Sequence, residues 1–210
     1  MTAVAGPPAR ARWLKTLHRW HWISSAIALV GMLLFAATGL TLNHAAQIEA
    51  HPRVVDRKAT LPPALLAAHA PAPGDARRHD PLPADVADWV ATALQADVRG
   101  RPAEWSADEL YVALPRPGGD AWVRIVRASG EAELEDTDRG WISYLNDLHK
   151  GRNAGGAWRW FIDAFAVACL VFTITGLAIL KMHAGHRAAT WPLLGLGVVL
   201  PLLLALLFIH

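Results

Sequence analysis

Apolar and polar residues are arranged on two different length scales along this chain. Three runs are almost purely apolar, and the first of them, from Trp20 to Leu42, holds 23 residues without a formal charge. At a rise of 1.5 Å per residue such a run makes roughly 35 Å of helix, which is enough to cross the hydrocarbon core of a bilayer. The pattern predicts transmembrane helices over residues 20–42, 158–180 and 191–209.

Between the first and second runs the apolar residues follow shorter periods. Val86 and Val90 recur at helical spacing, whereas Leu110 and Val112 alternate with polar or small residues, as in a half-buried strand. The expected elements are a helix over 83–97, strands near 110–114, 121–127 and 131–136, and a short helix that ends near 150. This order predicts a small α+β unit, in which one helix packs on a three-stranded antiparallel sheet.

Prolines mark the segment that joins the first run to this unit. Residues 51–83 hold seven of the 14 prolines and show no apolar period, so we expect a linker or an extended strap there. The predicted organisation is a tail at 1–19, transmembrane helices at 20–42, 158–180 and 191–209, a linker at 43–82, the α+β unit with a juxtamembrane helix at 83–157, and a loop at 181–190.

Composition agrees with a protein that lies partly in a membrane. Hydrophobic residues make up 53% of the chain, and the mean hydropathy is +0.24. Six of the ten tryptophans flank the three runs, as in membrane-interface belts: Trp13, Trp20, Trp22, Trp158, Trp160 and Trp191. The one cysteine, Cys169, excludes a disulfide framework and covalent haem attachment through CxxCH, so any haem must be bound non-covalently.

Charge predicts the orientation in the membrane. Four basic residues and no acidic residue precede the first run, the 181–190 loop is also basic, and all 18 acidic residues lie between Glu49 and Asp163. By the positive-inside rule the N-terminus and this loop are cytoplasmic, whereas the soluble unit and the C-terminus are periplasmic. We expect an uncleaved anchor rather than a signal peptide, because the first apolar run is about twice the usual length of a signal core.

Histidines stand at both ends of the first two runs. Imidazole is the side chain most often used to ligate a metal. His18 and His21 lie at the start of the first run and His44 follows it, while His149 precedes the second run and His183 and His186 follow it. The predicted topology therefore groups His44 with His149 outside, and His18 or His21 with His183 or His186 inside.

An internal echo supports this grouping. Thr38-Gly39-Leu40 lies near the end of the first run, and Thr175-Gly176-Leu177 lies near the end of the second. Leu17-His18-Arg19 and Leu148-His149-Lys150 precede the same two runs. Because the two predicted spans run in opposite directions, the echo has the character of an inverted repeat.

Several of these segments carry a family resemblance. They are Leu17–Trp20, Trp141–Arg152, Trp158–Trp160, Thr175–Leu177 and the helix-plus-hairpin unit with Ser129-Gly130-Glu131, all within residues 12–187. Together they resemble the PepSY-associated transmembrane proteins of bacterial inner membranes. The expected fold class is a membrane α-helical protein with three transmembrane helices and a small periplasmic α+β PepSY-like unit.

The resemblance implies haem binding and electron transfer. Members of this family are associated with iron-siderophore uptake and periplasmic reduction, and some bind two b-type haems through histidines. Carried onto this chain, the resemblance implies an outer haem b held by His44 and His149 and an inner haem b held by His18 and His183. His21 and His186 are the alternative inner ligands. Electrons from quinol or a cytoplasmic donor would reach a periplasmic acceptor such as a ferric siderophore, which would make the chain a reductase or the electron-carrying subunit of one.

Two features argue against a complete, self-sufficient reductase. The chain departs from the larger reductase members in having three spans and one short soluble unit, as an electron-carrying component that needs another protein would. His18 and His44 are also 26 residues apart, or roughly 39 Å along a straight helix. This distance is long for one electron-transfer step unless the porphyrins point toward each other, a third carrier intervenes or a homodimer shortens the path. The alternative is a haem-free accessory protein that binds a periplasmic partner or inhibits a protease.

The remaining polar residues have simpler interpretations. Asp163 is expected to pair with Arg159 one turn earlier, with a proton acceptor at the outer site as the alternative. No basic stripe with interleaved aromatic residues occurs in the soluble part, so nucleic acid is excluded and the lipid bilayer is the expected partner. No Ser/His/Asp set or phosphate loop supports hydrolase or kinase chemistry. Solvated positions are expected for His51, His69, His79, Arg19 and Arg152.

Overall fold

The computed structural model of the 210-residue chain describes residues 9–48, 51–69 and 79–209, except the side chain of His186. The chain divides into two compact units. One unit comprises the residues up to Leu34 and from Ile162 onward, and the other comprises Phe35–Phe161. Two of the long helices, α1 and α5, contribute to both units, and each unit is described by itself.

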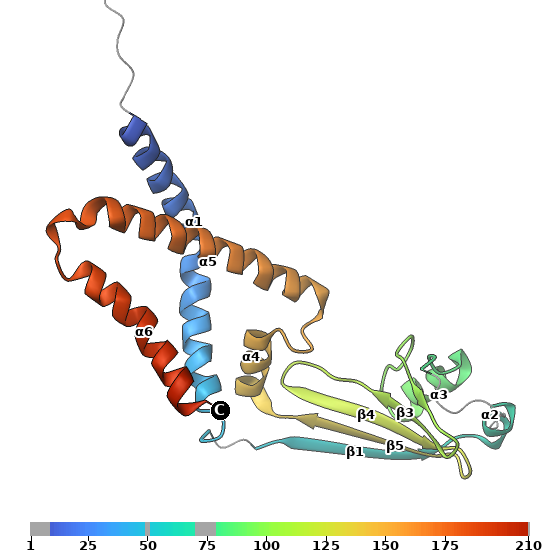
Figure 1. The fold of residues 1–210 in the computed structure, drawn as a ribbon. Coiled ribbons are helices and arrows are strands. Elements are labelled where there is room, and N and C mark those ends of the chain that lie inside the picture. The colour runs from blue at the N-terminus through green and yellow to red at the C-terminus, as the bar shows by residue number, and fades with distance from the viewer. Residues whose placement is uncertain (1–8, 49–50, 70–78, 210) are drawn as a thin grey trace, which may run out of the picture. The chain divides into compact units, whose positions relative to one another are not determined.

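The first unit consists of apolar helices. α1 (Ala9–Asn43), α5 (Gly155–His183) and α6 (Thr190–Phe208) are each long and apolar enough to cross a membrane (Figure 1). Their large apolar side chains point outward, and Leu33 and Leu206 are 71% and 76% exposed. Such a surface is stable in hydrocarbon, where the helix satisfies its own backbone hydrogen bonds. The three predicted transmembrane helices are confirmed, and α1 and α5 both begin before their apolar runs.

Small residues bring α1 and α5 close together within this unit. Ala28 of α1 is completely buried, and Ser24 of α1 and Thr175 of α5 are nearly so. At Gly31 an added Cβ would overlap the ring of Phe165. Helices in lipid associate through close packing of this kind, because apolar contact alone gives no advantage over lipid.

The second unit is built on a five-stranded antiparallel sheet (Figure 1). β1 pairs with β5 along its whole length, from Arg53 opposite Asp138 to Thr60 opposite Glu131. The strands are β1 (Arg53–Thr60), β2 (Glu104–Trp105), β3 (Glu109–Ala113), β4 (Gly119–Val126) and β5 (Glu131–Asp138), in the order β1-β5-β4-β3-β2. The three predicted strands are confirmed as β3, β4 and β5, and the sheet has two more.

Part of the predicted linker or extended strap at residues 51–83 forms regular structure. Residues 53–60 are extended, as a strap would be, but they form strand β1 at the edge of the sheet. A short helix, α2 (Pro63–Ala68), follows it, and Leu65 and Leu66 of this helix pack against the core. Proline suits the start of α2, since Pro63 opens the helix where an N–H would have no partner.

The core of the second unit lies between the sheet and helix α3 (Ala84–Ala93). Val86, Val90 and Leu94 are almost completely buried on one side of this helix, and they pack against inward residues of the strands such as Val112 and Val123. Burial of one such side chain contributes about 1.5–3 kcal/mol. The predicted helix over 83–97 is confirmed, although it ends earlier than expected.

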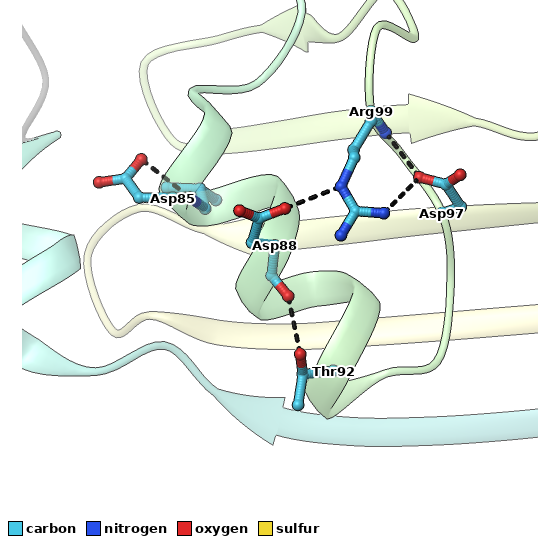
Figure 2. Close-up of polar contacts among 6 residues, drawn as sticks. Asp85, Asp88, Thr92, Asp97 and Arg99 are labelled. Atoms are coloured by element: carbon cyan, nitrogen blue, oxygen red, sulfur yellow. Dashed lines mark hydrogen bonds and ion pairs between the residues drawn. The ribbon is translucent and has the colours of Figure 1, made fainter.

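Polar contacts hold the outer side of α3 (Figure 2). Arg99 Nε donates to Asp88 Oδ1 at 2.7 Å, and the Arg99 backbone N–H donates to Asp97 Oδ1 at 3.2 Å. His69 Nε2 lies 3.0 Å from Asp85 Oδ2, and this hydrogen bond lowers the pKa of Asp85. His69 is therefore the partner of a carboxylate rather than a solvated residue.

Helix α4 (Gly140–Lys150) docks on the turn between β3 and β4. Asp147 is only 8% exposed, and its Oδ2 accepts a hydrogen bond from the Gly118 backbone N–H at 2.9 Å. Gly118 has φ +73°, and an added Cβ there would lie 2.8 Å from Tyr144 Cα. The helix ends at Gly151, whose left-handed φ of 66° suits glycine. The predicted short helix is thus confirmed and is fixed to the sheet.

Candidate functional site

The first candidate site is the His149 cluster, which consists of His149 on α4 and Phe35, Thr38 and Gly39 on α1. His149 Nδ1 lies 2.8 Å from Thr38 Oγ1, and the imidazole packs on Phe35 with ring centroids 4.9 Å apart. Gly39 leaves room for the ring, since an added Cβ would lie 3.6 Å from His149 Cε1. All four residues belong to the second unit.

The second candidate site is the His21 cluster, which consists of His21 on α1 and Phe172, Thr175 and Gly176 on α5. His21 Nδ1 lies 3.1 Å from both Thr175 Oγ1 and the Phe172 carbonyl oxygen. The imidazole stacks on Phe172 with ring centroids 4.7 Å apart and planes 15° apart. An added Cβ at Gly176 would lie 3.2 Å from His21 Cε1. All four residues belong to the first unit.

The two clusters share one pattern. In each, a Phe-x-x-Thr-Gly-Leu segment of one helix receives a histidine from another helix, and the segments are residues 35–40 and 172–177. The Thr-Gly echo predicted from the sequence therefore has a structural basis. Its counterpart to His149 is His21 rather than His18, and the phenylalanine three residues before each threonine is the part of the pattern that sequence reasoning missed.

A carbonyl and two hydroxyls orient the two imidazoles. The Phe172 carbonyl can only accept, so His21 donates to it through Nδ1 and keeps on Nε2 the lone pair that a metal ligand requires. Thr38 Oγ1 lies 2.8 Å from His149 Nδ1, and a hydroxyl can donate to this nitrogen or accept from it.

His18 of α1 and His183 of α5 lie close together. Their ring centroids are 6.1 Å apart and the ring planes are nearly perpendicular, at 84°. His18 Nδ1 lies 2.9 Å from the Leu14 carbonyl and His183 Nδ1 lies 2.8 Å from the Ile179 carbonyl. Both rings therefore donate through Nδ1 and keep an Nε2 lone pair, and both are exposed.

His44 does not contact His149 among the residues that the structure describes. Its ring is exposed, and its Nδ1 lies 2.9 Å from the Leu40 carbonyl. The predicted partner, His149, is instead held by Thr38. A direct His44–His149 contact is thus not formed, although the two imidazoles each keep Nε2 without a described partner.

The other predicted site residues have simpler surroundings. Arg152 lies 3.7 Å from Asp147, and Asp163 is exposed on α5. The His186 side chain and residue His210 lie outside the described part of the chain. Within the described ranges, no group of three or more His, Cys, Asp or Glu side chains is placed to hold a metal ion.

The His18 and His183 rings are in edge-to-face contact, with centroids 6.1 Å apart and planes at 84°, which lies within the usual range for paired rings. Each ring donates through Nδ1 to a carbonyl of its own helix. An imidazole oriented in this way is the kind of side chain that can hold a haem iron through Nε2.

Comparison with known proteins identified one family. The profile of a family described as PepSY_TM-like matches residues 12–210, nearly the whole chain. No curated protein and no solved structure matches the chain.

Proposed function

Since the chain belongs to the PepSY_TM-like family, we propose that it is a b-haem-binding electron-transfer protein of the bacterial inner membrane. In this proposal two haems b lie near opposite membrane faces, and electrons from quinol or a cytoplasmic donor pass to a periplasmic acceptor such as a ferric siderophore. The observation that carries the proposal is the approach of His18 to His183, with ring centroids 6.1 Å apart.

The proposed inner site rests on these two rings. Each donates through Nδ1 to the carbonyl four residues earlier in its own helix, at 2.9 and 2.8 Å. Such hydrogen bonds fix the ring orientation and raise the basicity of the remaining nitrogen. His21, the alternative ligand of this site, is engaged with Thr175 and Phe172, which makes it a support for helix packing in the proposal.

The proposed outer site uses His44 and His149. His149 is oriented by Thr38 and His44 by its own helix, and each keeps Nε2 for a ligand. Haem, when bound, supplies a one-electron couple whose potential depends on the axial ligands and on burial. The task of the chain in this proposal is to orient the two imidazoles so that Nε2 of each can bind the iron.

Difference spectroscopy tests the proposal directly. The protein is purified from haem-fed cells, and the reduced-minus-oxidised spectrum is recorded for the wild type and for His183→Ala, His149→Ala and the control His79→Ala. His79 is exposed and lies in the soluble unit. We expect b-type bands in the wild type and the control and the loss of about half of the haem in each of the other two variants. A spectrum without b-type bands, under conditions that load a control cytochrome, would leave the haem-free accessory function.

Transfer across the membrane needs a second measurement. Haem-loaded protein is placed in vesicles with reductant inside and a ferric chelate outside, and iron reduction is followed for the wild type, His183→Ala and His79→Ala. We expect His183→Ala to be slow and His79→Ala to match the wild type. Equal rates for all three, after correction for leakage, would refute the electron-transfer role.

The proposed orientation has its own test. The positive-inside rule places the basic N-terminus and the 181–190 loop in the cytoplasm. Alkaline phosphatase fused after residue 100, or after the last residue, should be active in both cases. An inactive first fusion would place the sheet in the cytoplasm and overturn the outer-site assignment.

A further inference from the structure

A cavity in the second unit has the chemistry of an anion site. Its volume is about 250 Å³, and it lies between the residues that follow α1 and the first turn of α4. Its polar lining consists of His51, Arg139, Ser143 and Asn146, and no carboxylate lines it. Every one of these side chains offers a hydrogen-bond donor, and Arg139 carries a fixed positive charge.

Asn146 shows that the cavity is built rather than incidental. It is 8% exposed, and its Oδ1 accepts a hydrogen bond from Thr41 Oγ1 at 2.9 Å. Its amide nitrogen has no partner among the described residues, although the side chain lines the cavity. The amide nitrogen can therefore donate a hydrogen bond to a ligand in the cavity.

The start of α4 adds backbone donors. The Arg139 N–H donates to the Gly118 carbonyl and the Gly140 N–H donates to Asp138 Oδ1, at 2.8 and 2.7 Å. The next two N–H groups, of Trp141 and Ile142, have no acceptor within the described chain, and both residues line the cavity. The first turn of α4 contains no acidic residue to satisfy them. Free N–H groups at a helix N-terminus favour an anion.

Two carboxylates bind residues at the start of α4 but do not line the cavity. Asp120 Oδ2 accepts from Arg139 Nη2 at 2.9 Å, and Asp138 accepts from Gly140. Neither carboxylate lines the cavity. Asp120 thus holds one edge of the guanidinium and leaves its other donors available.

The surroundings indicate where the anion comes from. Ile48 lines the cavity only five residues after the end of α1, a helix of membrane length. Trp141 also lines it and is 69% exposed, as aromatic residues at a membrane interface are.

We propose that this cavity binds the phosphate head group of an anionic phospholipid, with Arg139, Asn146 and the first N–H groups of α4 as its ligands. The site fixes the start of α4 to the membrane surface. It is independent of haem, and the protein for its test is prepared without added haem.

Ser143 offers a matched pair of variants. Ser143→Asp places a negative charge in the cavity, and an acidic residue in the first turn favours the helix, so the fold is kept. Ser143→Asn introduces a side chain of nearly the same shape as that of Ser143→Asp, but without the charge. Full-length protein in a neutral maltoside detergent is titrated with dioctanoyl phosphatidylglycerol or dioctanoyl phosphatidylcholine, and the bound lipid is counted by native mass spectrometry.

We expect the wild type and Ser143→Asn to bind phosphatidylglycerol at least about tenfold more tightly than phosphatidylcholine. Ser143→Asp should lose about tenfold in phosphatidylglycerol affinity, and its unchanged circular dichroism spectrum would confirm the fold. Equal affinity for the two lipids, or equal phosphatidylglycerol affinity of the Asp and Asn variants, would overturn the proposal. Displacement of phosphatidylglycerol by inorganic phosphate at equal concentration would assign the site to a free anion and overturn the lipid assignment.

Discussion

The His21 cluster and the His149 cluster follow one pattern but differ in what holds the histidine. His21 Nδ1 has two acceptors, Thr175 Oγ1 and the Phe172 carbonyl, and both partner helices are long and apolar. His149 Nδ1 has Thr38 as its described hydrogen-bond partner, and His149 sits on the short helix α4. Asp147, two residues before His149, binds the turn of the sheet at Gly118.

This difference means that different parts of the molecule determine the positions of the two imidazoles. The position of His21 depends on helix packing alone. The position of His149 depends also on the docking of α4 on the sheet. Substitutions at the contact between α4 and the sheet should therefore alter the environment of His149 and leave that of His21 unchanged. The following variants test that separation.

Substitution of Gly118 should have the largest effect. Gly118→Ala combines a left-handed φ of +73° with a Cβ that lies 2.8 Å from Tyr144 Cα, and we expect a loss of about 3 kcal/mol in the free energy of unfolding of the second unit. Gly100→Ala is the control, because Gly100 has φ +66° but open space around it, and it should cost about 1 kcal/mol. Urea unfolding of the full chain measures both, and equal losses would refute the docking of α4.

Removal of the Asp147 carboxylate should have the second-largest effect on stability. Asp147→Ala leaves the buried Gly118 N–H without its acceptor, which costs about 2 kcal/mol. Nitrogen-15 NMR of the imidazoles should show a changed His149 resonance and an unchanged His21 resonance. The exposed Asp97→Ala variant should leave both unchanged. A shift of His21 in Asp147→Ala would contradict the separation of the two clusters.

The two threonines should not be equivalent. Thr38→Val removes the described hydrogen-bond partner of His149 Nδ1 and should cost about 1 kcal/mol, with broadening of the His149 resonance. Thr175→Val leaves His21 the Phe172 carbonyl at 3.1 Å, so its resonance should stay sharp. Equal broadening in the two variants would show that the second acceptor of His21 contributes nothing.

The two glycines should differ by a smaller amount. Alanine in place of a helical glycine gains about 0.5–1 kcal/mol, and Gly39→Ala should keep this gain because its Cβ would be 3.6 Å from His149. At Gly176 the distance to His21 is 3.2 Å, so the ring must move and the gain should disappear. Melting temperatures in detergent compare the two, and a more stable Gly176→Ala than Gly39→Ala would reverse the argument.

The smallest expected effect is that of low pH on the stability of the sheet. Glu133 accepts from Lys58 at 3.0 Å and from Arg124 at 2.9 Å, and these contacts lower the pKa of Glu133 below its usual 4.5. A lowered carboxylate pKa contributes stability that is present above the unfolded-state pKa and is lost as the pH falls through the folded-state pKa. Glu133→Gln should therefore flatten the decline of the melting temperature below pH 4.5. The control Glu104→Gln should show the same decline as the wild type. A decline of equal slope in all three proteins would show that the contacts of Glu133 with Lys58 and Arg124 do not cause it.

The apolar runs and the alternating strands were predictable because they are local patterns. Strand β1 was not, because its charged residues Arg57 and Lys58 and the neighbouring prolines hide its alternation. Its pairing depends on β5, which lies far along the chain. Edge strands with charged side chains are common, since the charges oppose further pairing.

The histidines of the candidate site were predictable from the sequence, but the residues that contact each imidazole were not. Thr38 and His44 are six residues apart, which turns His44 about 120° round the helix from the side that meets α4. Depth in the membrane alone therefore does not predict which residue of this segment contacts His149. His18 and His21 lie on neighbouring turns, and the helix contacts alone decide that His21 meets Thr175 while His18 meets His183.

The pairing of β1 with β5 has a mechanical consequence. The chain enters the sheet at Arg53 and leaves it at Asp138, and these two residues face each other at the same end of the ladder. Tension that pulls residue 53 away from residue 138 would load one pair of strand hydrogen bonds at a time, as in the opening of a zipper. The eight pairs would then part in sequence at low force instead of resisting together in shear.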